Sequence, residues 1–432
     1  MALWLKSGGA DFEDRFKALL ALKREQSTDV NDKVAAIIAR VREGGDAVLI
    51  DLTKTYDSVD LRLAGIRVTP AELAAARSLV DARTFAALKL AHDRILDHHC
   101  RQLPADDRYT DSQGVELGSR WTPVPSVGLY VPGGTASYPS SVLMNAVPAK
   151  VASVPRVVMV VPAPKGVLNP LVLVAAELAG VSEIYRLGGA QAIAALAYGT
   201  ESIAPVAKIV GPGNAYVAAA KRQVFGQVGI DMIAGPSEVV VIADRDNDPA
   251  WIASDLLAQA EHDEAAQAIL ITDDADFASA VEKAVEIELT VLPRAATART
   301  SWKGFGAVIL VGSLAEAPSI VDRLAPEHLE IATHEADALA ALINNAGAIF
   351  IGRYTPEVIG DYVAGTNHVL PTARSARFAS GLSVLDFMKR TSTLKLDPES
   401  LAALGPAAMV LAEAEGLDAH RRSVAIRLNP RD

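Results

Sequence analysis

The sequence predicts an α/β fold of two parallel-sheet domains with helical segments at both ends of the chain. Apolar strand-like segments alternate with helical segments from residue 126 to residue 225, the pattern of a parallel sheet covered by helices on both faces. A second alternating series begins after Pro236. Residues 11–25 repeat apolar side chains at helical spacing, and the pattern from Leu382 onward is mainly helical. We therefore expect two incomplete Rossmann-like domains with helical N- and C-terminal appendages.

The expected strands and domains follow the chain in order. Short strands are predicted at residues 127–131, 156–161, 183–187, 208–210, 239–242, 268–271, 307–311 and 348–351, with a strand pair over residues 107–122. The predicted domains are an N-terminal helical segment (1–25), a first α/β domain (26–130 plus 237–381), an inserted Rossmann-like domain (131–236) and a C-terminal helical segment (382–432).

Composition and charge narrow the classes of protein and partner. The 432 residues include 41 Lys and Arg against 52 Asp and Glu, a net charge of −11, which argues against a nucleic-acid partner. A single cysteine excludes an intrachain disulfide and fits a reducing compartment. The N-terminus lacks a signal-peptide pattern, and no uncharged apolar run reaches roughly 18 residues. We expect a cytoplasmic protein without a membrane span.

The segment from Asp248 to Thr272 carries the first candidate site. Asp248 precedes a proline, which is typical of a helix start, and Ile252 then opens a buried helical stripe. Gln259 and His262 continue that stripe with polar side chains three residues apart, so both can reach one point. An imidazole and an amide oxygen suit zinc or manganese. A helix end at which both side chains meet solvent explains the spacing as well.

Glu327 and His328 form the second candidate site. Pro326 fits a first helical position, so we expect both residues in the first turn of a helix, whose positive end would disfavour a charged imidazole. A neutral imidazole beside a carboxylate is suited to acid–base chemistry. The alternative is a first-turn acid next to a surface histidine.

Three glycine-rich turns follow predicted strands, where open parallel sheets bind ligands. They are Gly133-Gly134, Gly188-Gly189 and Gly211-Pro212-Gly213-Asn214. Tyr130, Gln191 and Asn214 stand beside these turns and could hold a base, ribose or phosphate. The sequence contains no Gly-x-Gly-x-x-Gly fingerprint, and tight packing explains the glycines equally well.

Three further polar residues stand in loops or at helix ends. Asp361, between two glycines, could ligate a metal or cap a loop. His420 lies just past a helix-ending glycine near the C-terminus. His368 has no clear partner in the sequence.

Long segments resemble the histidinol dehydrogenase family. They occur in the order of that family from about Trp121 to His420: GLYVPGG, RLGGAQAIAALAYGT, KIVGPGNAYV, FGQVGIDMIAGPSEV, LLAQAEHD, LAPEHLEI, GDYVAGTNHVLPT, SVLDFMKR and EGLDAH. The resemblance implies oxidation of L-histidinol to L-histidine through L-histidinal, in the last steps of histidine biosynthesis. It also implies two NAD per turnover, one zinc ion per subunit, and a homodimer with exchanged C-terminal parts and shared active sites.

The resemblance also implies a role for each candidate residue. Glu327 and His328 would be the acid–base pair. The zinc ligands would be Gln259, His262, Asp361 and, from the other subunit, His420. Substrate would contact Ser237, Gln259, His262, His328, Asp361, Glu415 and His420. NAD would contact Tyr130, Gln191 and Asn214 of the inserted domain.

Two other classes of protein share some of these ingredients. A zinc hydrolase also uses a metal, a glutamate and a water molecule, but it would not need the glycine-turn α/β insertion. A non-catalytic binding protein could use the same scaffold.

Overall fold

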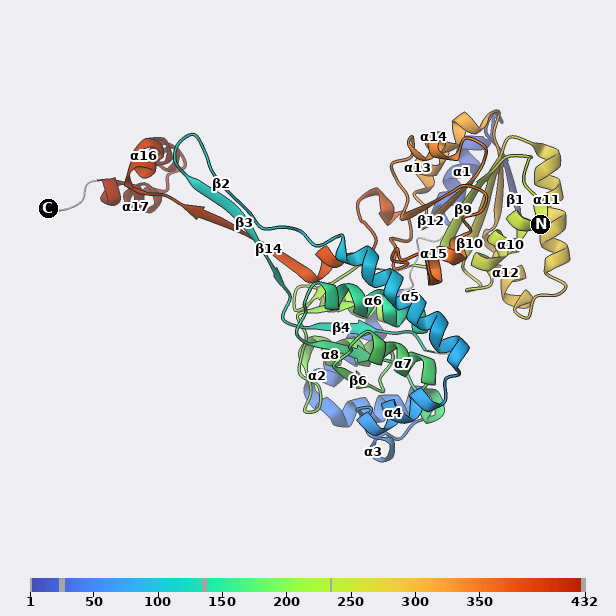
Figure 1. Cartoon of the computed structure of the whole chain (residues 1–432), viewed down its shortest axis with the longest axis horizontal. Coiled ribbons are helices and arrows are strands. Elements are labelled where there is room, and N and C mark those ends of the chain that lie inside the picture. Colours follow the sequence, from blue (N-terminus) through green and yellow to red (C-terminus); the bar gives the residue numbers. More distant parts are fainter. Residues whose placement is uncertain (1, 23–27, 134–137, 234, 429–432) are drawn as a thin grey trace.

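The computed structural model describes residues 2–22, 28–133, 138–233 and 235–428. Two bodies of sheet and helix lie next to each other, and a long arm projects from them (Figure 1). The sheets have the strand orders β1-β11-β10-β9-β12-β13, β6-β5-β4-β7-β8 and β14-β3-β2. The first two are parallel and form the bodies, whereas the third is antiparallel and forms the arm. The predicted α/β class is confirmed.

The six-stranded sheet is covered by helices on both faces. Its strands are β1 (Leu3–Lys6), β11 (Ala307–Leu310), β10 (Gln267–Thr272), β9 (Glu238–Ala243), β12 (His328–Ala332) and β13 (Ala348–Ile351). One face packs on α10 (Pro249–Ala260), α11 (Ala275–Glu288) and α12 (Ala295–Phe305). The other face packs on α1 (Phe12–Ala21), α13 (Ala317–Leu324) and α14 (Ala336–Ala340). Successive strand residues point to opposite faces, so Val239 and Val240 enter different cores.

The five-stranded sheet is built in the same way. Its strands are β6 (Glu183–Tyr185), β5 (Val157–Val160), β4 (Val127–Tyr130), β7 (Lys208–Val210) and β8 (Gly229–Ile230). One face packs on α4 (Pro70–Ser78), α5 (Ala82–Cys100), α6 (Pro139–Val151) and α7 (Pro170–Leu178). The opposite face packs on α2 (Thr28–Asp57), α3 (Leu61–Ala64), α8 (Gly189–Tyr198) and α9 (Ala215–Val224).

This packing differs from the domain grouping expected from the sequence. The helices within residues 28–100 cover the five-stranded sheet, so that segment does not join residues 237–381 in one body. The N-terminal segment is also not purely helical, because Leu3–Lys6 pairs in parallel with β11. Amphipathic helices specify that a face is buried but not which sheet buries it.

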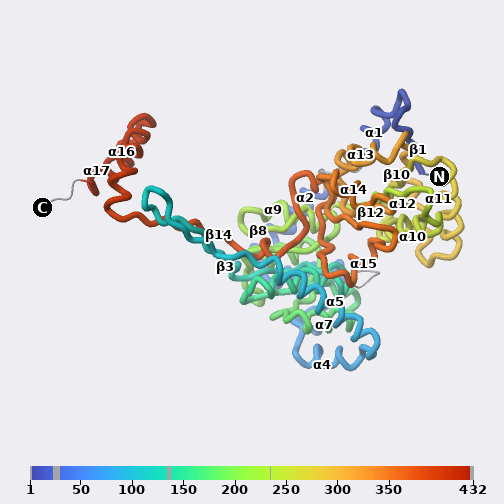
Figure 2. Tube along the Cα trace, turned by 45° about the horizontal axis from the view of Figure 1, so that its top comes forward, coloured from blue at the N-terminus to red at the C-terminus, as the bar shows by residue number. Residues whose placement is uncertain are grey.

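The arm combines two distant parts of the chain. Its strands are β2 (Asp107–Thr110), β3 (Glu116–Pro123) and β14 (Met388–Lys395), and its helices are α16 (Pro398–Ala414) and α17 (Asp418–Leu428). The expected strand pair over residues 107–122 is present as β2 and β3. The C-terminal segment, expected to be mainly helical, also contains the strand β14, which precedes its two long helices. Figure 2 shows α16 and α17 at the far end of the arm, away from both bodies.

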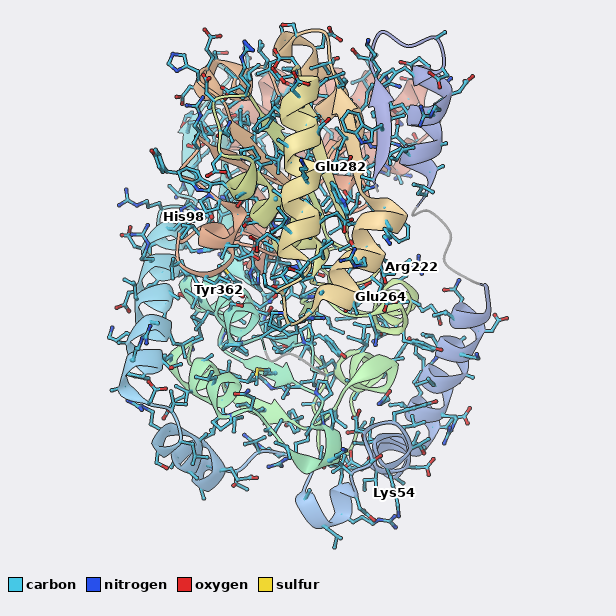
Figure 3. All side chains as sticks on the ribbon, turned by 90° about the vertical axis from the view of Figure 1, so that its right-hand side faces the viewer. Lys54, His98, Arg222, Glu264, Glu282 and Tyr362 are labelled. Carbon is cyan, nitrogen blue, oxygen red and sulfur yellow. The ribbon has the colours of Figure 1, made fainter. Side chains whose placement is uncertain are left out.

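Short helices and inter-body contacts complete the fold. The short helices are α15 (Glu357–Tyr362), η1 (Pro164–Gly166), η2 (Leu314–Glu316), η3 (Ser375–Arg377) and η4 (Val384–Phe387). Arg94 of α5 reaches across to the other body and donates to the carbonyl oxygens of Val363 and Ala364 at 2.5 and 2.9 Å. Figure 3 shows Tyr362 and His98 at one side of this junction. Within the described ranges, no helix has the length and apolar character needed to cross a membrane.

A buried ion pair fixes one glycine turn of the five-stranded body. Lys221 Nζ donates to the Gly211 carbonyl oxygen at 2.9 Å and contacts one Asp231 carboxylate oxygen, while the other accepts from the Gly211 N–H at 2.8 Å. Both charged side chains are at most 2% exposed. Gly211 has a φ of 109°, and an added Cβ would collide with the carbonyl oxygen of Tyr130. The ion pair therefore holds a peptide that only glycine can form here.

We expect Lys221→Met to lower the free energy of unfolding by about 3–5 kcal/mol, because it leaves the Asp231 charge buried without a partner. Urea denaturation followed by circular dichroism measures the loss. The double variant Lys221→Met/Asp231→Leu should recover most of it, since no buried charge remains. As a control, Arg40→Met breaks the exposed Arg40–Asp51 pair and should cost at most about 1 kcal/mol. A loss of that small size for Lys221→Met would contradict the role of the buried pair.

Candidate active site

The acid–base pair lies at the amino end of the six-stranded sheet. Glu327 precedes β12 and His328 is its first residue, paired in register with Val239 of β9. The predicted helix is therefore wrong. The preceding helix, α13, ends at Leu324, and Ala325 turns the chain through the left-handed region at φ 46°. The proline signal is local, whereas all residues of β12 are buried between two neighbouring strands, which favours the strand.

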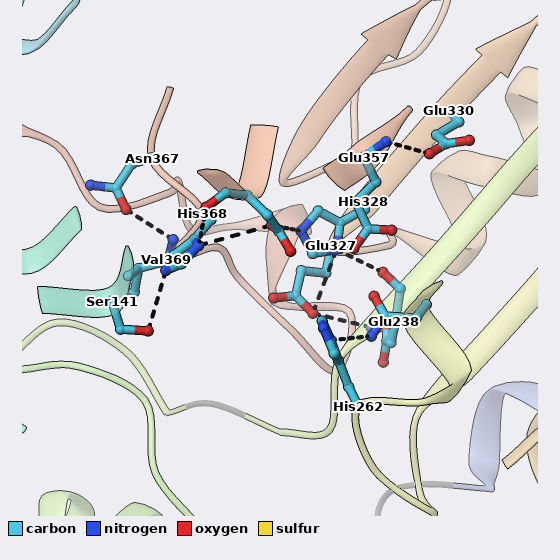
Figure 4. A network of polar contacts seen from close by, with 12 residues as sticks. Ser141, Glu238, His262, Glu327, His328, Glu330, Glu357, Asn367, His368 and Val369 are labelled. Atoms are coloured by element: carbon cyan, nitrogen blue, oxygen red, sulfur yellow. Dashed lines mark hydrogen bonds and ion pairs between the residues drawn. The ribbon is translucent and has the colours of Figure 1, made fainter. Parts of the chain in front are cut away.

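The peptide groups of Glu238 hold both side chains of the pair (Figure 4). The Glu238 N–H donates to Glu327 Oε2 at 3.1 Å, and the Ser237 side chain also hydrogen-bonds Glu327. His328 Nδ1 lies 3.2 Å from the Glu238 carbonyl oxygen. A carbonyl only accepts, so Nδ1 carries the proton in the neutral ring. His328 Nε2 is then the proton acceptor, and it is buried without a hydrogen-bond partner.

Burial sets the protonation of both residues. It lowers the pKa of His328 to about 4, so the imidazole is neutral near pH 7. The neutral ring expected from the sequence thus has a different cause, which is desolvation instead of a helix end. Burial also raises the pKa of Glu327 well above its usual value, and the charges of Glu238 and Asp361 raise it further. Glu327 therefore holds its proton unless a positive charge lies nearby.

Helix α10 positions Gln259 and His262 as its sequence indicates. Asp248 caps the helix by accepting from the Ala250 N–H at 2.9 Å, and Pro249 follows the cap. Gln259 is fully buried, and its Nε2 lies 3.2 Å from His262 Nδ1. Gln259 Oε1 is buried and has no partner. The predicted meeting of these two side chains is confirmed, and an unsatisfied oxygen stands beside it.

Asp361 and His368 join this cluster from a third segment. Asp361 lies in α15, and its Oδ1 is 3.8 Å from His328 Nε2 and 3.9 Å from His368 Nδ1. His368 Nε2 lies 3.4 Å from the Ser141 hydroxyl of α6, so the cluster touches the other body. Figure 4 shows His262 in the same network of polar contacts as Glu327, His328 and His368. His368 had no clear partner in the sequence, because its partners are distant along the chain.

Sequence reasoning also missed Glu357. Its Oε1 lies 3.5 Å from His328 Nδ1, and its Oε2 is buried without a partner. Glu357 N donates to Glu330 Oε1 at 2.5 Å, and Glu330 in turn hydrogen-bonds Asp255 of α10. Burial raises the pKa of all three carboxyls. In the sequence Glu357 looks like an ordinary first-turn acid after a proline, so nothing marks it as buried.

The donors of this cluster fit a zinc ion. His328, Glu357 and Asp361 offer ligand atoms that lie within 4.8 Å of one another. Gln259 and His262, expected as ligands together with Asp361, are the pair described above at the C-terminal end of α10. Imidazole nitrogen with carboxylate and amide oxygen is a donor set that zinc accepts. The unsatisfied Gln259 oxygen and the excess of buried carboxyls also favour a cation, because both are costly without one.

The three expected cofactor residues lie at the carboxyl edge of the five-stranded sheet. Tyr130 ends β4, and its hydroxyl oxygen accepts from the Gly189 N–H at 3.1 Å. Burial raises the pKa of Tyr130 to about 12. Gln191 is buried in the first turn of α8, whereas Asn214 is exposed and caps α9 through the N–H groups of its first turn. Gly134 of the first turn lies outside the described residues.

Glu415 and His420 do not reach the cluster within one chain. Glu415 follows α16 and His420 lies in α17, both exposed at the end of the arm. The antiparallel strands β3 and β14 carry these helices away from the bodies (Figure 2).

Comparison with known proteins assigns the family. A family model described as histidinol dehydrogenase matches residues 20–428. Curated relatives named histidinol dehydrogenase include one from Brucella suis biovar 1, 68% identical over 99% of this chain and 100% of the relative. Another, from Agrobacterium fabrum, is 66% identical over 100% of both chains. The crystal structure of histidinol dehydrogenase from Elizabethkingia anophelis is 35% identical, with a TM-score of 0.94 over 99% of this chain and 98% of that chain.

The match extends over nearly the whole chain, includes every segment that builds the cluster, and is accompanied by the same three-dimensional fold. The chain belongs to the histidinol dehydrogenase family.

Proposed function

We propose that the protein oxidises L-histidinol to L-histidine through L-histidinal, with NAD as hydride acceptor and zinc as a resident metal. This reaction would form the last steps of histidine biosynthesis. The observation that carries the proposal is the buried Glu327–His328 pair, held by the two peptide groups of Glu238 beside a set of metal-type donors, in a chain 68% identical to a curated histidinol dehydrogenase. A zinc hydrolase is not favoured, because the family match extends through the five-stranded body as well.

His328 acts as the base in the first oxidation. Its unprotonated Nε2 accepts the proton of the substrate hydroxyl, while the hydride on the same carbon leaves to NAD and the aldehyde forms. The Glu238 carbonyl keeps Nδ1 protonated and orients the ring. A positive imidazolium is then stabilised by the carboxylates of Glu357 and Asp361, which lie 3.5 and 3.8 Å from its nitrogens.

Glu327 acts in the second oxidation. As a carboxylate it takes a proton from the water that adds to the aldehyde. The resulting diol then loses a hydride to a second NAD while His328 takes the hydroxyl proton, which leaves the carboxylic acid. Ser237 and the Glu238 N–H keep the carboxylate oriented. Bound zinc supplies a positive charge that orients the polar groups of the substrate and lowers the pKa of neighbouring carboxyls.

Gln259, His262 and Asp361 would hold the zinc, with His420 from a second copy of the chain as the fourth ligand. Substrate would also contact Ser237 and the Glu415 of that second copy. This assignment makes the protein a homodimer with exchanged arms and shared active sites. It is supported by the exposure of α17 far from the bodies of its own chain.

The two bodies would bind different ligands. The five-stranded body would bind NAD along its carboxyl edge through Tyr130, Gln191 and Asn214, and the six-stranded body would hold metal and substrate. The enzyme would work in the cytoplasm as a small-molecule enzyme without nucleic-acid or membrane partners, as the acidic charge and the single cysteine suggest.

The direct test is a histidinol-dependent assay with metal analysis. We expect purified protein to contain one zinc per subunit and to form two reduced nicotinamides per histidinol consumed, as measured by absorbance and product analysis. Removing the metal with a chelator should abolish turnover, and adding zinc should restore it. Protein that carries zinc but forms no reduced nicotinamide from histidinol would overturn the proposal.

We expect Glu327→Gln and His328→Asn each to reduce kcat by about 10²–10⁴-fold, the usual contribution of a general acid or base. Zinc content should remain at the wild-type level, since neither residue is an assigned ligand. Matched controls are Glu335→Gln and His334→Asn, two exposed neighbours that should keep full activity. Unaltered rates in folded, zinc-loaded variants of Glu327 and His328 would defeat the assignment.

We expect His420→Ala and His262→Ala each to lose zinc and activity as pure proteins. Mixed dimers should recover up to about half of the wild-type zinc content and activity, because one of their two sites would combine an intact His262 from one chain with an intact His420 from the other. Separately tagged subunits allow mixed dimers to be purified and their zinc content and rates to be measured. Absence of recovery in verified mixed dimers would contradict the shared site.

A further inference from the structure

Asp57 ends helix α2 with an unsatisfied carboxylate oxygen. Helix α2 covers the same face of the five-stranded sheet as α8 and α9. The Asp57 Oδ2 atom is buried and has no hydrogen-bond partner. Nearby carboxylates of this segment are paired: Asp51 with Arg40, and Asp60 with Lys54 and Arg62. Asp57 has no ion pair with any residue in the described parts of the chain.

The Asp57 side chain lies near the cofactor edge of the sheet. Leu52 and Val59, which flank Asp57 along the chain, belong to the same apolar cluster as Tyr130, and the charge of Asp57 also contributes to raising the pKa of Tyr130. The pKa of Asp57 is itself raised by burial. An unpaired buried carboxylate oxygen is costly, and a protein keeps one where a ligand supplies the missing donor.

The Tyr130 hydroxyl lacks an acceptor among the described residues, just as Asp57 Oδ2 lacks a donor. The hydroxyl oxygen itself accepts from the Gly189 N–H at 3.1 Å. A ligand bound here would therefore have to donate a hydrogen bond to Asp57 and accept one from the Tyr130 hydroxyl. Adjacent hydroxyl groups of a sugar can provide both at once.

The helices on the two faces of the five-stranded sheet indicate how NAD is oriented across its edge. Ser141 of α6 lies 3.4 Å from His368, so the reacting centre is on the α6 side. Helix α6 covers one face of the five-stranded sheet and α2 covers the other. We consider a dinucleotide that lies across the carboxyl edge of the sheet with its nicotinamide at the reacting centre. Its adenosine end then lies on the side of Asp57.

We propose that Asp57 accepts a hydrogen bond from the adenosine 2′-hydroxyl of NAD, while the adjacent 3′-hydroxyl accepts from Tyr130, and that Asp57 thereby selects NAD over NADP. The 2′-phosphate of NADP would replace a donated hydrogen bond with negative charge beside a buried carboxylate. This inference rests on the proposed NAD-dependent function and adds a residue that sets cofactor specificity.

Calorimetric titration of the zinc-loaded enzyme tests the inference with three probes: NAD, NAD lacking the adenosine 2′-hydroxyl, and NADP. Wild-type protein should bind the deoxy analogue about tenfold to a hundredfold more weakly than NAD, the range for a hydrogen bond to a charged group. Asp57→Ala should weaken NAD binding by a similar factor, leave the deoxy analogue nearly unchanged, and narrow the gap between NAD and NADP. KM for NAD should rise while kcat, KM for histidinol and zinc content stay near wild type.

Asp51→Asn is the matched control, because Asp51 lies on the same helix in an exposed ion pair and should change none of these values. Asp57→Asn preserves the side-chain volume and serves if Asp57→Ala does not fold. Equal weakening of NAD and the deoxy analogue in the Asp57 variants would overturn the inference. So would a wild-type enzyme that does not distinguish the two, a result that needs no variant. Wild-type protein that binds no NAD at all would defeat the proposed function itself.

Discussion

The two peptide groups of Glu238 determine where the reactive side chains stand. The N–H of Glu238 donates to Glu327 and its carbonyl oxygen faces His328 Nδ1. Glu238 begins β9 one residue before the first β9–β12 pair, His328 with Val239, so its peptide groups extend past the ladder toward β12. The side chains of Glu327 and His328 take the places that strand partners would otherwise fill. A shift of the register by one residue would turn His328 to the other face of the sheet, so strand pairing and catalytic geometry are one constraint.

The strand pairing buries Glu327 and His328, so a charge on either side chain carries a large desolvation penalty. Burial alone keeps His328 neutral and Glu327 protonated, and Glu357 and Glu330 share the same environment. So many buried carboxyls can ionise together only near positive charge. The same desolvation that would destabilise an empty site therefore makes it selective for a cation and for a substrate with basic groups. Histidinol, with an imidazole and an amine, is such a substrate.

The sequence predicted correctly those features that depend on interactions between residues close together in the chain. The Asp-Pro start and the apolar stripe of α10 act within one helix, so its start and the meeting of Gln259 with His262 could be predicted. Pro326 gave the opposite result, since its helix signal is outweighed by the pairing of β12 with two strands remote in sequence. Strand β1 was missed for the same reason, being four residues long and defined only by its partner β11. The convergence of Asp361 with His328 came from family resemblance alone, because no local pattern joins them.

The arm of a single chain leaves apolar side chains exposed. Helices α16 and α17 pack closely on each other, with Val424 and Leu428 approaching Gly405. Their outer sides leave Val410, Leu411 and Ile426 between 64% and 68% exposed. Burying such side chains is worth roughly 1.5–3 kcal/mol each, so a surface that covered them would stabilise the arm. If that surface is the body of a second copy, the apolar side chains hold the arm while His420 completes the metal site. Zinc binding and assembly are then thermodynamically linked, since free energy that the fourth ligand adds to metal binding stabilises the association equally.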